Sequence, residues 1–242
     1  MAKNSGSRND FPEIFGKLSE YYARRRLYTA LDKVARQDEP FRVLISTVIS
    51  QRTKDEVTEK ASKRLFSRFP TIQSLAAAQT KDVEECIRDA GFYRTKSTCI
   101  IQIAKIIERR YGCAVPDSIE EMMELPLVGR KTANCVLVYG FGKAAIPVDT
   151  HVHRISNRLG IVSTRNVEET ERELRRQIPR RFWIGINELF VLHGRSVCRP
   201  ISPRCEICPV SELCAFFRTG KSGERRSSKG VSSGRKGVSN VL

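Results

Sequence analysis

The sequence predicts an all-α protein, and three observations carry this prediction. Apolar residues recur at spacings of three and four along nearly the whole chain, as on a helix with one buried face. Alternating apolar and polar runs, which would indicate half-buried strands, are scarce. The one Val- and Ile-rich stretch, FRVLISTVISQ at 41–51, is long for a strand and has helical neighbours, so we expect a buried helix there. The pattern predicts roughly ten helices and no strand.

Residues at the expected helix ends support the same division. Glycine in a left-handed conformation stops many helices, and Asp, Asn, Ser or Thr side chains cap the first turn. The expected stops follow 81–90, 98–111 and 152–159, at Gly91, Gly112 and Gly160. The expected N-caps are Thr80, Asp117 and Asn166.

Charge and apolar content restrict the class of protein. The chain has 242 residues, enough for one large or two small domains, and 43 Lys and Arg against 27 Asp and Glu give a formal charge of +16. A charge of this size favours nucleic acid as the partner. No stretch approaches the ~20 apolar residues of a membrane-spanning helix, and the start, MAKNSGSRND, lacks the apolar core of a signal peptide. We therefore expect an intracellular protein, in which the eight cysteines do not form disulfides.

The two ends of the chain differ from the rest. Residues 1–9 are polar, and 219–242 consist mainly of Gly, Ser and basic residues with almost no large apolar side chain. Such segments bury too little surface to offset the entropy of ordering, so we expect a flexible N-terminus and a disordered basic tail. Either extra phosphate contacts or solubility alone would account for the charge of the tail.

Four cysteines crowd into the stretch CRPISPRCEICPVSELC. They are Cys198, Cys205, Cys208 and Cys214, spaced C-x6-C-x2-C-x5-C. Neighbouring thiolates repel one another unless a cation compensates, so the spacing predicts a metal site. Zinc sites with four cysteines usually contain two short C-x2-4-C pairs, and here only Cys205 and Cys208 form such a pair. One short pair with longer loops favours a [4Fe–4S] cluster, and zinc is the alternative. Arg199 and Arg204, in the same loop, are candidate phosphate contacts.

The stretch LPLVGRKTANCVL predicts a turn followed by a helix that begins near Arg130. With the helix expected from SIEEMMEL, it forms a helix–hairpin–helix over 117–141. A phosphate-binding P-loop is excluded, because Arg130 separates Gly129 from Lys131 and no strand precedes the turn. The amides around Val128 and Gly129, together with Arg130, would instead meet a nucleic-acid phosphate at the start of the second helix.

Lys131 lies in the first turn of this second helix, where an acidic residue would suit the helix dipole better. One interpretation is a solvated surface lysine. The other is a reactive amine, because the helix N-terminus, partial burial and the neighbouring Arg130 would lower the pKa of the lysine. An unperturbed lysine is only ~0.1% neutral near pH 7.4, and a pKa lower by ~2 would raise that fraction about a hundredfold.

The segment AAIPVDTHVHRISNRLG contains a candidate carboxylate, Asp149. It follows an extended Pro-Val pair and precedes a helix, so it suits an N-cap, and it can also act in catalysis if one oxygen stays free. His151 and His153 stand two residues apart on that helix and point to different faces, which makes them a poor metal pair.

Four of these features, in the same order, resemble the endonuclease III family of DNA glycosylases, within the helix–hairpin–helix superfamily. They are LPLVGRKTAN, VDTHVHR, LFVLHGRSVC and the cysteine spacing, and the match runs over roughly residues 10–217. The resemblance implies two helical lobes with a DNA-binding cleft between them and a [4Fe–4S] cluster held by the four cysteines. One lobe would be the continuous chain 35–145. The other would combine the N-terminal helix in 10–34 with 146–218, including the cluster loop 198–214.

The resemblance also implies the chemistry. Lys131 matches the family's nucleophile and Asp149 its catalytic carboxylate, so the protein would be a bifunctional glycosylase and AP lyase of base-excision repair that removes oxidised pyrimidines. The lysine would attack C1′ of a flipped nucleotide and form a Schiff base, and β-elimination would cut the strand on the 3′ side. The partner would be duplex DNA with a damaged base or an abasic site. We expect a monomer that does not associate with a membrane and that acts in the cytoplasm or nucleoid.

Departures from the family leave the substrate open. The hairpin of the family usually reads L-P-G-V-G, and here Leu127 replaces the first glycine. In the family, a glutamine fills the space that the flipped-out base leaves in the duplex. In ISQRTKDEVTEKA, Arg52 rather than Gln51 aligns with this glutamine, so the resemblance leaves open which base the protein prefers opposite the lesion. The alternatives are a mismatch-directed uracil or thymine glycosylase of the same superfamily and a DNA-binding metalloprotein without catalysis.

Two further residues match family positions. Phe92, in GFYR, matches a wedge into the opposite DNA strand, and a core aromatic in a turn is the other interpretation. Asp55 matches a carboxylate near the base pocket, and a helix N-cap is the alternative. We expect Gln51, Arg52 and Phe92 to contact DNA.

Overall fold

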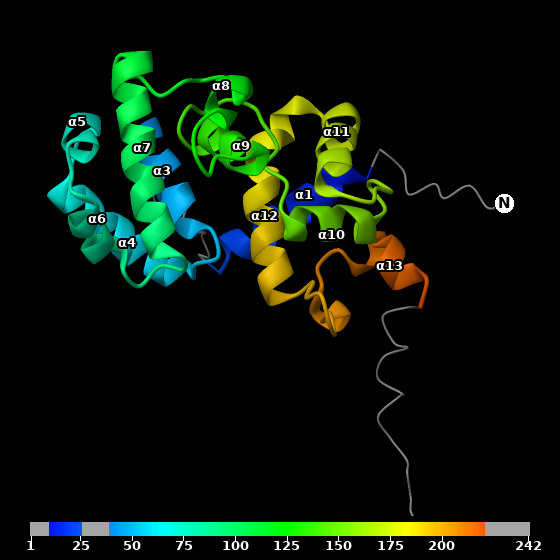
Figure 1. Ribbon diagram of the computed structural model, residues 1–242. Helices are drawn as coiled ribbons and strands as arrows, with labels where there is room; N and C mark the ends of the chain where they lie inside the picture. The colour runs from blue at the N-terminus through cyan, green and yellow to red at the C-terminus, as the bar shows by residue number, and fades with distance from the viewer. Residues whose placement is uncertain (1–9, 26–38, 221–242) are drawn as a thin grey trace, which may run out of the picture.

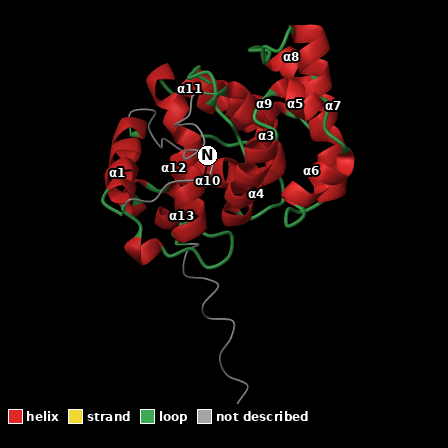
Figure 2. Ribbon diagram, turned by 90° about the vertical axis from the view of Figure 1, so that its left-hand side faces the viewer, coloured by secondary structure: helices red, strands yellow, loops and turns green. Residues whose placement is uncertain are grey.

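The computed structural model describes residues 10–25 and 39–220, and all regular elements in these two ranges are helical (Figure 2). The all-α prediction is therefore confirmed for the described part of the chain. The expected flexible segment 1–9, the lobe boundary between residues 34 and 35, and the tail from residue 221 onward lie outside the described residues.

Seven helices between residues 40 and 139 share one apolar core. They are α3 (Pro40–Ser50), α4 (Asp55–Arg68), α5 (Ile72–Ala76), α6 (Thr80–Ile87), α7 (Tyr93–Tyr111), α8 (Ile119–Met123) and α9 (Arg130–Tyr139). The expected helix in 41–51 is α3, and its Val and Ile side chains are fully buried between α4, α7 and α9. A helix that is apolar on all sides belongs inside a bundle, which is why its composition resembles that of a buried strand.

The remaining helices build a second core around α12. They are α1 (Phe11–Ala23), α10 (Thr150–Leu159), α11 (Val167–Gln177), α12 (Trp183–Ser196) and α13 (Ala215–Arg218), with 3-10 turns at Arg180–Phe182, Cys205–Ile207 and Ser211–Leu213. The N-terminal α1 packs here, far from its neighbours in sequence, and Figure 1 shows it in blue beside the later helices. Its Phe11 and Phe15 rings lie 5.4 and 4.9 Å from the ring of Phe182.

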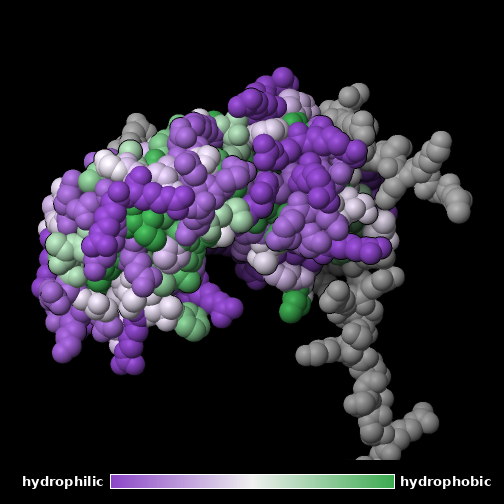
Figure 3. All heavy atoms as spheres, turned by 45° about the horizontal axis from the view of Figure 1, so that its top comes forward, coloured by the Kyte–Doolittle hydropathy of each residue, from purple (hydrophilic) through white to green (hydrophobic). Residues whose placement is uncertain are grey.

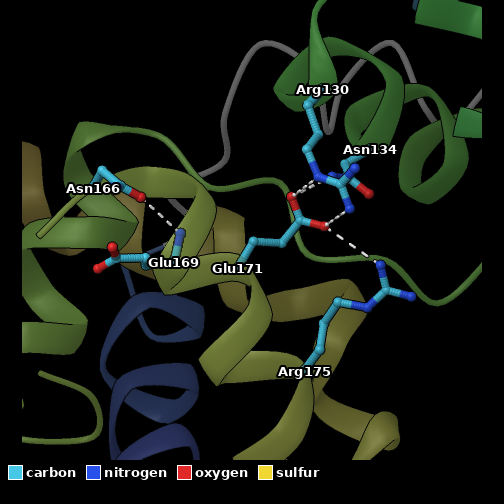
Figure 4. Close-up of polar contacts among 6 residues, drawn as sticks. All are labelled: Arg130, Asn134, Asn166, Glu169, Glu171 and Arg175. Carbon is cyan, nitrogen blue, oxygen red and sulfur yellow. Dashed lines mark hydrogen bonds and ion pairs between the residues drawn. The ribbon is translucent and has the colours of Figure 1, made fainter. Parts of the chain in front are cut away.

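The helix ends agree with the sequence at three of six positions. Gly112 and Gly160 end α7 and α10 in left-handed conformations, and Asn166 caps α11 by accepting the amide of Glu169 at 2.8 Å (Figure 4). The other three predictions are wrong. Gln79 and Ser118 are the N-caps of α6 and α8 in place of Thr80 and Asp117, and α6 already ends at Ile87, before Gly91.

Two ion pairs join the helices of the two cores. The Arg130 guanidinium on α9 donates to both carboxylate oxygens of Glu171 on α11, at 2.8 and 3.0 Å, and Asn134 Nδ2 donates to the same group at 3.1 Å (Figure 4). Arg195 on α12 forms the second pair, with both oxygens of Asp55 at the start of α4. We call the two groups of helices the hairpin lobe (39–145) and the cluster lobe (10–25 and 146–220).

We expect Glu171→Gln to lower the free energy of unfolding by about 1–3 kcal/mol. The Glu171 side chain is 5% exposed, so the change leaves cationic and amide donors without their buried anion, although the half-exposed Arg130 limits the loss. Urea unfolding checks this value. Glu168→Gln, the same change at an exposed position of α11, is the control and should keep the wild-type midpoint; equal midpoints for both variants would contradict the prediction.

The visible surface is mainly hydrophilic, with small, scattered apolar areas (Figure 3). Among the described residues, no helix has the length and apolar character needed to cross a membrane.

Candidate active site and metal centre

The hairpin between α8 and α9 sets the position of Lys131. Val128 donates its amide to the carbonyl of Leu125 at 3.1 Å and is itself buried, so α9 starts directly after this turn, with Gly129 as its N-cap. The expected role of the Val128 amide is thereby corrected, because that amide is taken up by the turn. The amides from Gly129 onward lie in the first turn of α9, where a helix has no internal partners for them.

Lys131 is half-buried and lies one turn before Cys135, the residue with the largest electrostatic effect on its amine. Cys135 and the carboxylate of Asp149 raise the pKa of Lys131, against the opposing effects of burial and of the Arg195 guanidinium. Burial also raises the pKa of Cys135, so the protonation of this thiol and that of Lys131 depend on each other, and the Asp149 carboxylate raises the pKa of both.

The predicted lowering of the Lys131 pKa is therefore wrong for the free protein. The expected cationic neighbour is absent from the amine, because Arg130 turns away to Glu171, and an anionic neighbour takes its place. The same observation brings Lys131 and Asp149 together, as a nucleophile and a carboxylate of one site would be.

Asp149 serves as the N-cap of α10 and retains a second oxygen. Its Oδ1 accepts the amides of His151 and Val152, both at 2.9 Å. Its Oδ2 takes no part in this cap, so the cap and a catalytic role are compatible.

A cavity of about 590 Å³ opens beside the start of α9, and its lining comes from three turns of the hairpin lobe and from the first turn of α7. The lining residues are Gln51, Arg52, Phe92, Thr95, Lys96 and Leu127. Three of them are non-glycine residues in left-handed conformations: φ is +51° at Arg52, +57° at Phe92 and +58° at Leu127. Such a backbone costs about 1 kcal/mol or more per residue, and residues of this kind often gather at functional sites.

The side chains of the cavity contact one another across these turns. Gln51 Nε2 donates to the carbonyl of Leu127 at 2.9 Å, and the Arg52 guanidinium lies 5.5 Å from the centre of the Phe92 ring. Phe92 is 63% exposed, so it is no core aromatic, and Leu127 is 39% exposed. Asp55 lies behind this surface, in the ion pair with Arg195, and it follows the N-cap of α4 rather than forming it.

The four cysteines of the C-terminal loop line a common cavity of about 380 Å³. They come from the end of α12, a 3-10 turn and the start of α13, so the chain folds around this space. Burial and the neighbouring cysteines raise the pKa values of Cys205, Cys208 and Cys214, that of Cys208 to about 12. Thiolates are disfavoured there without positive charge, and iron–sulfur binding supplies that charge.

Two residues beside the cysteines were not singled out from the sequence. His193 Nε2 lies 3.6 Å from Cys208 Sγ, and Tyr22 OH lies 3.0 Å from His193 Nδ1. Arg158 lies 3.5 Å from Cys198 Sγ through one nitrogen and donates to the carbonyl oxygens of residues 199 and 200 at 2.6 and 2.8 Å. Arg158 comes from α10, 40 residues before Cys198, whereas His193 lies on α12 directly before the loop, within the motif LFVLHGRSVC.

The exposed cations of the loop lie at its outer side. Arg199 and Arg204 are both exposed, and Arg204 also lines the cavity of the cysteines. Among the described residues, no group of three or more His, Cys, Asp or Glu side chains is arranged to hold a single metal ion. The four thiols instead surround a space, which fits a cluster of several metal ions.

Comparison with known proteins agrees with this geometry. Residues 45–180 match the family model of the HhH-GPD superfamily base excision DNA repair proteins, and 198–214 match the iron–sulfur binding domain of endonuclease III. The chain is 52% identical to endonuclease III of Thermotoga maritima over 79% of its own length and 90% of the relative. It is 35% identical to endonuclease III of Bacillus subtilis, over 79% and 85%.

Solved structures show the same fold. A trapped endonuclease III–DNA covalent intermediate matches with a TM-score of 0.76 and 31% identity, over 89% of this chain and 99% of the other. A thermostable thymine-DNA glycosylase matches with a TM-score of 0.77 at 20% identity, over 88% and 97%, which concerns the fold alone.

Fold and site together define a helix–hairpin–helix protein of base-excision DNA repair with an iron–sulfur domain. Within this class, the chain belongs to the endonuclease III family. It is a DNA glycosylase with AP lyase activity, it binds DNA, and its cofactor is a [4Fe–4S] cluster.

Proposed function

We propose that Lys131 is the nucleophile and Asp149 the catalytic carboxylate of this glycosylase and lyase, and that its substrates are oxidised pyrimidines in duplex DNA. The observation that carries the proposal is the Coulombic effect by which Asp149, the N-cap of α10, acts on the pKa of Lys131 in the first turn of α9. In one site, a carboxylate can take up, directly or through a water molecule, the proton that an amine nucleophile must lose and regain.

In the proposed reaction, removal of the base is followed by cleavage of the strand. Asp149 accepts a proton from the Lys131 ammonium, and the neutral Nζ attacks the sugar C1′ while the bond from C1′ to the base breaks. The base leaves with the bonding electron pair and takes up a proton. The C1′–O4′ bond then opens, which leaves a protonated Schiff base at C1′ and a hydroxyl at C4′. Loss of a proton from C2′ expels the 3′ phosphate, and water releases the lysine.

DNA contacts in this proposal come from both lobes. Gly129 and the following amides of α9 meet a phosphate, and Arg199 and Arg204 meet the backbone from the cluster lobe. Gln51, Arg52 and Phe92 enter the duplex where the damaged nucleotide leaves it, which the exposure of Phe92 supports. Arg130 and Asp55 act from behind, through their ion pairs between the lobes.

Cys198, Cys205, Cys208 and Cys214 are the proposed ligands of the [4Fe–4S] cluster. When bound, the cluster supplies the positive charge that stabilises four neighbouring thiolates. Arg158 and His193 then hold the loop against α10 and α12, so that Arg199 and Arg204 keep a constant orientation toward the DNA. We further propose a monomer that acts in the cytoplasm or nucleoid.

Borohydride reduction on a duplex with an abasic site tests the proposed nucleophile. Reduction of a Schiff base leaves a stable secondary amine, so wild-type protein should form a covalent adduct with the DNA. Peptide mapping should place the adduct on Lys131. No adduct with wild-type protein would refute the lyase mechanism and favour DNA binding without catalysis.

A substrate panel tests the damaged base. Thymine glycol should be removed faster than thymine or uracil in a G mismatch. A damaged base costs less free energy to unstack and flip out of the duplex, and the cavity beside α9 lies where the flipped nucleotide would leave it. The specific observation for the alternative is Arg52, whose guanidinium reaches the cavity where a relative with glutamine has an amide. Preferred removal of mismatched thymine or uracil would assign the mismatch-directed activity instead.

A further inference from the structure

A buried lysine in the wall of the hairpin-lobe cavity has no carboxylate partner among the residues that the structure describes. Lys96, near the start of α7, is 3% exposed. Its Nζ donates to the carbonyl oxygens of Ile49 and Gln51 at 2.7 and 2.5 Å and to Thr53 Oγ1 at 3.0 Å. An ammonium group out of water is costly unless it is compensated, and these three acceptors are all uncharged.

The acceptors lie at the end of α3. A helix leaves its last carbonyls without internal partners at the negative end of its dipole, and a cation is stabilised there. Lys96 therefore holds the turn that leaves α3, residues 51–54, to the start of α7. The Lys96 ammonium makes this connection through hydrogen bonds to uncharged acceptors, and its positive charge strengthens them.

Thr53 extends the same network to a second turn. Its Oγ1 also accepts the amide of Gly91, at 3.2 Å, in the turn between α6 and α7. A Cβ atom at residue 91 would lie 2.5 Å from the carbonyl oxygen of Arg52, so glycine allows the two turns to lie against each other. The turns joined in this way present Arg52 and Phe92, two of the three left-handed residues of the cavity.

We propose that Lys96 is a positioning residue for lesion recognition: its ammonium holds the turn 51–54 so that Gln51 and Arg52 face the DNA beside Phe92. This inference rests on the proposed DNA contacts of these three side chains. Two strained turns need a common support, because each left-handed residue would otherwise relax to a conformation of lower energy.

The protonation of Lys96 provides an independent test of this arrangement. Burial lowers the pKa of Lys96 to about 8, and the guanidinium of Arg52 lines the same cavity. An ammonium has three N–H donors for the three acceptors, whereas a neutral amine has two. One acceptor of the turn therefore loses its donor as the pH rises through about 8.

Binding to a duplex with a tetrahydrofuran abasic analogue, which the enzyme cannot cleave, measures the effect. Lys96→Met should weaken this binding about tenfold and leave binding to the undamaged duplex within about twofold, because phosphate contacts are unchanged. At saturating DNA, the rate of borohydride trapping on a true abasic site should stay within about twofold of wild type. Lys105→Met, the same change at an exposed position of α7, is the matched control and should bind as wild type.

The pH profile separates positioning from general stability. Wild-type affinity for the analogue duplex should fall about tenfold between pH 7 and 9.5, and that of Lys96→Arg should stay constant, because arginine does not titrate there. Thr53→Val, which removes the hydroxyl with little change in shape, should weaken analogue binding severalfold even if Lys96→Met does not fold. Wild-type affinity that is constant over this range would overturn the proposal, as would equal losses on damaged and undamaged DNA.

This experiment also separates the two proposals. Binding to the analogue needs no nucleophile, so it tests Lys96 even if wild-type protein forms no borohydride adduct. A normal adduct with unchanged binding of Lys96→Met would leave Lys131 as the nucleophile and reject the role of Lys96.

Discussion

Lys131→Ala should reduce strand incision at thymine glycol and at abasic sites by at least about a thousandfold, because it removes the amine that forms the covalent bond to C1′. Binding to the tetrahydrofuran duplex should remain within about threefold of wild type, since the amine contributes one cation among many. Single-turnover incision and equilibrium binding on the same preparations measure both quantities.

Lys143→Ala is the control for this experiment. Lys143 is exposed, follows α9 in the chain and pairs with Asp117 away from the hairpin turn. Its replacement should leave incision within about twofold of wild type. Incision by Lys131→Ala at more than a tenth of the wild-type rate would mean that another nucleophile, or water, carries the reaction.

Cys208→Ala should cause the second large effect, the loss of the cluster. The wild-type protein should be brown and contain about four iron atoms per chain, whereas the variant should be nearly colourless and retain little iron. Without the cluster, the segment 198–218 has only short helical turns and should become sensitive to proteases. Structural zinc contributes about 10 kcal/mol or more in zinc-finger peptides, and because cluster binding is coupled to folding in the same way, we expect a large fall in the thermal midpoint.

Cys113→Ala controls for the loss of a thiol. Cys113 is half-buried in the hairpin lobe and is not among the residues that line the cavity of the four cysteines. Its replacement should leave iron content and midpoint unchanged. Stoichiometric zinc in a colourless wild-type protein would contradict the iron–sulfur assignment, and full iron content in Cys208→Ala would remove Cys208 from the proposed ligands.

The pKa of Lys131 could not be predicted from its neighbours in the sequence. Its position in the first turn of α9 and the neighbour Arg130 both predicted a lowered pKa, and both premises about the chain are correct. The pKa is nevertheless raised, because the effect of Cys135, with a smaller contribution from Asp149, outweighs that of burial, and Arg130 pairs with Glu171. In the proposed mechanism, a nucleophile that starts as an ammonium needs a base, and accepting that proton is the first role proposed for Asp149.

The sequence by itself determined the class of this protein. The helical period, the stops at Gly112 and Gly160, the hairpin before Lys131 and the cysteine spacing are local patterns, and local patterns follow from residue order alone. The same holds for the family, whose motifs are short and occur in a set order. The start of α9 at Arg130 and the buried helix α3 agree with these patterns.

Only the tertiary structure decided which groups meet across the chain. Glu171 meets Arg130, Arg195 meets Asp55, and Lys96 meets the end of α3, over separations of 41, 140 and 47 residues. Such pairs depend on how two cores pack and on which carbonyls a helix end leaves open, and no spacing in the chain records either. The left-handed backbone at Leu127 is a further case, since a non-glycine residue adopts it only where its surroundings hold it there.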